Sequence, residues 1–100
     1  MKLSDNFSLN EFTKSQTALR NGIDNTPSEE VIENLKALCE NVLQPIREYF
    51  LMPVFISSGY RSAALNHKLG SSISSQHVQG QAADATQEDI QFPVVEWFSP

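Results

Sequence analysis

Cysteine is almost absent from this sequence, since Cys39 is the single one among 100 residues. One cysteine excludes a disulfide within the chain and gives no sign of an oxidising compartment. Because Cys39 falls on an apolar helical pattern, we expect it to be a small residue of the core.

Long hydrophobic runs are also absent. No stretch approaches the roughly 20 apolar residues that a membrane-spanning helix needs. Residues 1–6 lack the apolar run of a signal peptide. The sequence as given therefore predicts no membrane partner and a cytoplasmic location.

Basic residues are scarce. The chain has 7 Lys and Arg residues against 12 Asp and Glu residues, and its net charge is −5 with neutral histidines. Nucleic-acid binding is disfavoured, because neutralising phosphates requires a basic patch that this sequence lacks.

What is present is typical of one small globular domain over residues 1–100. Hydrophobic residues make up 40% of the chain, enough for a modest core, and no internal repeat is visible. Ser8 and Glu11 form a capping box that predicts a helix start. Thr26-Pro27-Ser28-Glu29 predicts a second start, with the proline at the first helical position.

Apolar periodicity predicts the longest helix. Ile32, Leu35, Cys39 and Val42 recur at three- and four-residue steps, which indicates one buried stripe. Pro45 interrupts this pattern, so we expect a kinked or restarted helix there.

The second half of the chain alternates strand, helix and loop signals. Residues 54–58 are β-branched and aromatic, which predicts a short strand ended by Gly59. Ser62 predicts the N-cap of a helix over residues 63–69. Residues 92–98 predict a helix that begins at their proline.

The segment Ser75-Gln76-His77 and the segment Gly80-Gln81-Ala82-Ala83-Asp84 carry the chemistry. A neutral imidazole nitrogen and a carboxylate oxygen are ligands that catalytic zinc sites use. The alternative is a loop histidine and a turn or capping carboxylate, because short motifs often match by coincidence. The earlier segment Ser57-Ser58-Gly59-Tyr60-Arg61-Ser62 favours the zinc interpretation, because it completes a set of motifs that resembles a known family.

Together with Leu65-Asn66, these motifs resemble the zinc D-Ala-D-Ala carboxypeptidases and related peptidoglycan peptidases. The resemblance is specific over residues 57–84. It implies an α+β hedgehog/DD-peptidase fold, with N-terminal helices packed on a small, mainly antiparallel sheet, and peptidoglycan stem peptides as substrates. Carried over residue by residue, it implies zinc binding by His77 and Asp84, a place near the scissile peptide for Arg61, and a substrate contact by Ser75.

The chain departs from that family at the third zinc ligand, which is a later histidine in the family. No histidine follows Asp84 in this sequence, although a catalytic zinc normally has three protein ligands. His67 lies on a predicted surface helix. Glu96 is a candidate general base, but the position three residues later, where relatives place the last ligand, is Ser99, a poor ligand. The sequence therefore predicts a domain incomplete at its C-terminus, whose missing ligand lies beyond Pro100 or comes from another subunit.

Two functions stay open at this point. One is a zinc metallopeptidase; the other is a non-catalytic or truncated relative that keeps the fold, with at most weak binding of metal or cell-wall peptide. A serine hydrolase built on Ser75 is disfavoured, because no nucleophile elbow surrounds that serine. The lack of an export signal fits a phage or prophage protein that reaches the cell wall during lysis. The apolar C-terminal segment, which includes Trp97, predicts a homo-oligomer.

Overall fold

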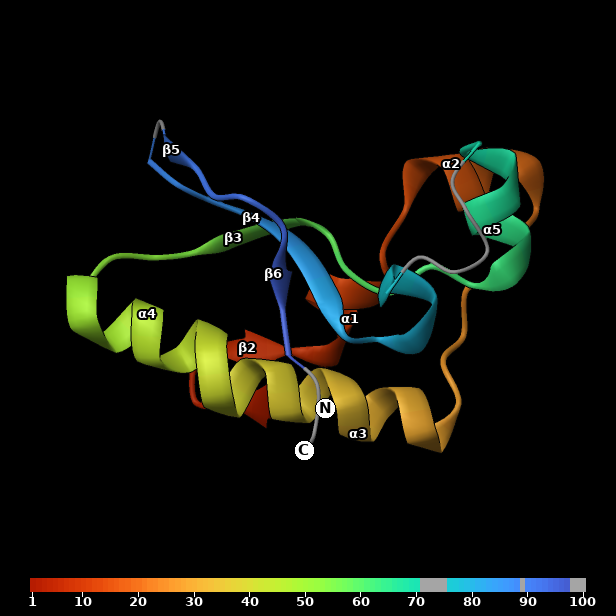
Figure 1. Ribbon diagram of the computed structural model, residues 1–100. Helices are drawn as coiled ribbons and strands as arrows, with labels where there is room; N and C mark the ends of the chain where they lie inside the picture. Colours follow the sequence, from red (N-terminus) through yellow and green to blue (C-terminus); the bar gives the residue numbers. More distant parts are fainter. Residues whose placement is uncertain (71–75, 89, 98–100) are drawn as a thin grey trace.

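A helical rod and a small antiparallel sheet lie one against the other in the computed structural model (Figure 1), which describes residues 1–70, 76–88 and 90–97. The expected α+β class is confirmed, because every strand pair among these residues is antiparallel and helices cover one face of the sheet. In the described part of the chain, no helix is both long enough and apolar enough to cross a membrane.

The N-terminal segment forms a two-stranded ribbon and two short helices. Strand β1 (Lys2–Ser4) pairs with β2 (Phe7–Ser8), and α1 (Leu9–Thr13) and α2 (Gln16–Asn21) follow. The predicted capping box at the start of α1 is confirmed: the Ser8 amide donates to the Glu11 carboxylate over 2.6 Å.

The rod consists of α3 (Glu29–Leu38), a π-helical segment (Cys39–Leu43) and α4 (Gln44–Phe50). Its predicted start at Thr26-Pro27 is wrong by two residues, because Ser28 is the N-cap and its hydroxyl accepts from the Val31 amide over 3.3 Å. The Thr26 amide donates to Asp24 instead, over 2.9 Å, so it belongs to a local turn.

The expected irregularity at Pro45 is present, as a π-helical turn directly before it. Proline has no N–H to donate to the carbonyl four residues earlier, so an ordinary α-helix would lose a hydrogen bond here. The structure instead bonds the Gln44 amide to the Cys39 carbonyl, five residues back. One extra residue in the turn rotates everything after it by about 100°.

That rotation explains why Gln44 is buried rather than exposed. Its side-chain oxygen accepts from the Ser4 hydroxyl over 2.7 Å and from the Asn6 amide over 3.0 Å. The π turn therefore holds the N-terminal ribbon against the rod.

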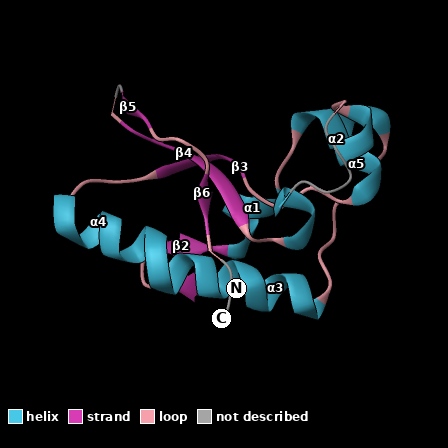
Figure 2. Ribbon diagram, in the orientation of Figure 1, coloured by secondary structure: helices cyan, strands magenta, loops and turns pink. Residues whose placement is uncertain are grey.

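Strand β4 (Ala82–Gln87) is the centre of the main sheet (Figure 2), with β3 (Phe55–Ser58) as one neighbour. Its other neighbour is a returning strand in two pieces, β5 (Ile90–Gln91) and β6 (Val95–Glu96). The predicted helix at the proline of residues 92–98 is therefore wrong. That proline lies between the two pieces, where a missing N–H does not break the ladder.

The two faces of this sheet differ in burial. Ile56, Ala83 and Ala85 belong to the core, which also contains Leu35, Leu38, Cys39 and Leu43 of the rod. Val95 and Trp97 pack against the same core, as expected for the apolar end of the chain. Asp84 alternates with the core residues of β4 and therefore faces outward.

Two short helices complete the structure. The predicted helix after Gly59 is confirmed as α5 (Ala63–Lys68), and the hydroxyl of its N-cap Ser62 accepts from the Leu65 amide over 3.2 Å. A single 3₁₀ turn (Gln76–Gln79) then leads into β4. Helices α2 and α5 lie together at one end of the molecule, beyond the end of the sheet (Figure 1).

Candidate active site

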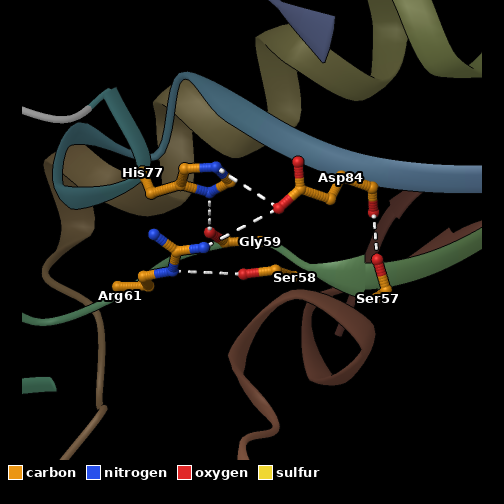
Figure 3. Close-up of polar contacts among 6 residues, drawn as sticks. All are labelled: Ser57, Ser58, Gly59, Arg61, His77 and Asp84. Atoms are coloured by element: carbon orange, nitrogen blue, oxygen red, sulfur yellow. Dashed lines mark hydrogen bonds and ion pairs between the residues drawn. The ribbon is translucent and has the colours of Figure 1, made fainter. Parts of the chain in front are cut away.

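Arg61, His77 and Asp84 converge from three separate segments (Figure 3): the turn after β3, the 3₁₀ turn and strand β4. One carboxylate oxygen of Asp84 lies 3.7 Å from His77 Nε2 and 3.7 Å from a terminal nitrogen of Arg61. The structure thus brings together three of the four residues that the sequence singled out. Ser75, the fourth, lies outside the described residues.

His77 is held in one orientation by its backbone partner. The residue is 6% exposed, and its Nδ1 lies 2.7 Å from the carbonyl oxygen of Gly59. Since a carbonyl can only accept, Nδ1 carries the proton, and in the neutral ring Nε2 presents its lone pair. That lone pair is on the side of Asp84.

Strand pairing fixes the position of Asp84. Its register partner is Ser58, and the register shifts between Ile56 and Ser58. The Ser57 hydroxyl donates to the Asp84 carbonyl over 3.2 Å. A strand irregularity of this kind changes the direction in which nearby side chains point. Here it lies where β3 ends beside Asp84.

Arg61 is fixed through both its side chain and its backbone. Its Nε donates to the Ser58 hydroxyl over 3.2 Å, and its amide donates to the His77 carbonyl over 3.1 Å. The guanidinium is thereby oriented toward Asp84. A guanidinium at this place suits binding of a carbonyl or carboxylate oxygen.

Gly59 is required by close packing against α1. A Cβ at this position would lie 2.7 Å from Phe12 Cα, too near for any side chain. The next amide, of Tyr60, donates to the Phe12 carbonyl over 2.8 Å.

Burial, and to a smaller extent the charge of Asp24, raises the pKa of Tyr60, so this phenol stays neutral at physiological pH.

Asn25 joins three segments around the site, and sequence reasoning missed it. Its side-chain nitrogen donates to the carbonyls of Thr13, over 2.9 Å, and Tyr60, over 3.2 Å. Its side-chain oxygen accepts from the Ser62 amide over 2.7 Å. A single asparagine in a loop gives no sequence signal, because its partners are distant along the chain.

The donor set fits two positions of a zinc site. Two ligands on a tetrahedral zinc are about 3.4 Å apart, and His77 Nε2 and the Asp84 oxygen are separated by 3.7 Å. The Gly59 carbonyl on Nδ1 is the kind of partner that orients metal-binding histidines. Among residues 1–70, 76–88 and 90–97, however, no group of three His, Cys, Asp or Glu side chains could hold a metal ion.

His67, the alternative ligand from the sequence, and Glu96, the candidate general base, lie on separate elements. His67 is on α5 and exposed. Glu96 is exposed on β6, opposite Ala82, and therefore on the outward face of the sheet that also carries Asp84.

Comparison with known proteins identifies the family of the chain. The model of the Peptidase M15 family matches residues 5–99. No curated protein and no solved structure gives a significant match. Since the match to the family spans nearly all of its sequence, the chain belongs to the Peptidase M15 family of metallopeptidases.

Proposed function

We propose that this chain is a zinc-dependent peptidase of the D-Ala-D-Ala carboxypeptidase type that acts on peptidoglycan stem peptides. The proposal rests on one observation. His77 Nε2 and a terminal nitrogen of Arg61 each lie 3.7 Å from the same carboxylate oxygen of Asp84. Two of these side chains suit a metal ion, and the third suits the oxygens of a peptide substrate.

His77 and Asp84 would hold the zinc, and a third ligand would come from outside the described residues or from a second copy of the chain. When bound, zinc supplies Lewis-acid polarisation of a carbonyl and of a water molecule. Arg61 orients the substrate by donating to the scissile carbonyl or to the terminal carboxylate. Glu96, on the same face of the sheet as Asp84, is the candidate for moving the proton to the leaving amine.

The test combines zinc calorimetry with an assay of D-alanine release from the synthetic pentapeptide L-Ala-D-Glu-L-Lys-D-Ala-D-Ala. We expect binding of one zinc per chain and hydrolysis, both abolished by His77→Ala. His67→Ala is the matched control, because it removes the other histidine from an exposed helix position. Zinc binding without hydrolysis of any stem peptide would instead support a non-catalytic relative.

A further inference from the structure

The candidate active site lies on the outward face of the main sheet, and this face extends beyond the site. The rod packs on the opposite face, which carries Ile56, Ala83 and Ala85 (Figure 2). Asp84 alternates with these core residues of β4 and faces outward. The outward side chains of the neighbouring strands therefore continue the surface of the site.

Phe55 is an exposed aromatic residue on this outward face. It precedes Ile56 of the core, and it pairs with Thr86, which alternates with Ala85. The residue is 62% exposed, whereas Ile56 is 6% exposed. One exposed apolar side chain is ordinary on a protein surface. The position of Phe55 relative to Asp84 is what distinguishes it.

Strand pairing places Asp84 between Phe55 and Glu96. Phe55 is opposite Thr86, two positions after Asp84 in β4, and Glu96 is opposite Ala82, two positions before it. Diagonal neighbours in an antiparallel sheet are about 7–8 Å apart, within reach of an aromatic side chain. One diagonal across β3, β4 and β6 thus carries an apolar ring, the candidate zinc ligand and the candidate general base, in that order.

Arg61 and Phe55 lie on opposite sides of Asp84 along the strands. Arg61 follows the end of β3 that pairs with Asp84, and His77 lies just before the first residue of β4 (Figure 3). Phe55 is at the other end of β3. A peptide whose terminal carboxylate meets Arg61 therefore extends its preceding residues toward Phe55. At about 3.3 Å per residue, the ring is about two residues from the scissile bond.

We infer that Phe55 is a specificity-determining residue, which contacts an aliphatic side chain at the second position before the scissile bond. The inference rests on the proposed peptidase function and deepens it, because it names the class of side chain that the enzyme prefers at one position. The contact is hydrophobic, since the ring presents apolar surface to water and a linear aliphatic chain would cover it.

The experiment compares two fluorescently labelled peptides of equal charge, L-norleucyl-D-Ala-D-Ala and L-Ala-D-Ala-D-Ala, each labelled at its amino terminus. Binding to the full chain is measured by anisotropy with EDTA present, so that hydrolysis does not interfere. We expect the norleucine peptide to bind about five- to tenfold more tightly, because the ring covers its three additional methylenes on one side. The preference should persist at high salt, because neither side chain is charged.

Phe55→Ala should abolish the preference, and Phe55→Leu should retain part of it. Tyr49→Ala is the matched control, because Tyr49 is an aromatic residue of α4 that is 81% exposed and lies off the sheet. Phe55→Ala should still unfold cooperatively in urea, since the ring is largely outside the core. Equal binding of both peptides by the unaltered chain, binding of neither, or a preference that survives Phe55→Ala would overturn the inference.

Hydrolysis with zinc is measured separately, as kcat/KM for the same two peptides. A Phe55-dependent preference in binding without hydrolysis of either peptide would support the contact with Phe55 and contradict the proposed peptidase. Hydrolysis of both peptides with equal kcat/KM would support the peptidase and contradict the role of Phe55.

Discussion

His77 donates through Nδ1 to the carbonyl oxygen of Gly59 over 2.7 Å, although 18 positions separate the two residues. Gly59 also packs directly against Phe12, where a Cβ would collide with the backbone. The residue that orients the histidine of the candidate zinc site is thus the residue through which β3 meets α1. The site and the core depend on each other at this point.

Gly59→Ala should therefore damage both stability and metal binding. Overpacking of this kind costs about 1–3 kcal/mol. The backbone shift that relieves it would displace the carbonyl that orients His77, which should weaken zinc binding about tenfold. Urea unfolding and zinc calorimetry measure the two effects. Gly70→Ala is the control, because a Cβ there meets nothing within 4 Å and only its φ of 75° is strained. An alanine at position 59 with unchanged stability would contradict this packing.

Asn25→Ala should destabilise the region around the site. Three backbone groups lose their partner, and each group left unsatisfied costs about 1–3 kcal/mol when buried, less when water can reach it. We expect a lower free energy of unfolding and a lower rate of peptide hydrolysis. Asn41→Ala is the matched control, since the exposed Asn41 side chain donates to the Ala37 carbonyl four residues earlier in the same helical rod. If both variants lose the same free energy of unfolding and the same activity, the hydrogen bonds of Asn25 do not stabilise the site specifically.

Arg61→Lys should separate substrate positioning from metal binding. Lysine keeps the charge but lacks the planar fork that contacts Ser58 and Asp84 together. Zinc affinity should stay near that of the unaltered chain, while kcat falls about 10²-fold, as on removal of a preorganised oxyanion donor. Calorimetry measures the zinc affinity of Arg61→Lys and of the unaltered chain, and a hydrolysis assay measures kcat for both. Full activity with lysine would rule out a role for guanidinium geometry.

Cys39 should be unreactive in the folded protein. Burial, followed by the charges of Glu11 and Glu40, raises the pKa of this thiol to about 12. Dithionitrobenzoate at pH 8 should label it only after unfolding in urea. A rate equal to that of a free thiol would show that the core opens readily.

The same thiol adds a pH dependence to stability. Its pKa is higher in the folded than in the unfolded chain, so its contribution is complete below about pH 9. The contribution is lost as the pH rises through the folded value of about 12. A Cys39→Ala variant should show a shallower loss of stability over this range.

Local signals in the sequence predicted much of the fold. The caps at Ser8 and Ser62 were predictable because each serine bonds a residue only three positions ahead, Glu11 and Leu65 respectively. Arg61, His77 and Asp84 were predictable as a group because a family motif specifies them, not because their spacing reveals contact.

Features decided by distant partners were not predictable. Val95 and Glu96 form a strand because the edge of β4 is available to them, which no local pattern records. Asn25 went unnoticed because its partners Thr13, Tyr60 and Ser62 are 12, 35 and 37 positions away. The helix start at Thr26 was wrong because Asp24 competes for the same amide.

The π turn before Pro45 makes this rod sensitive to its length as well as to its composition. Deleting any one residue between Cys39 and Leu43 would leave an ordinary α-helix and turn α4 by about 100°. Gln44 would then leave Ser4 and Asn6, whose hydrogen bonds attach the beginning of the chain. Point substitutions on the outer side of this turn should be tolerated. Deletion of one residue would instead release the N-terminal ribbon from the rod.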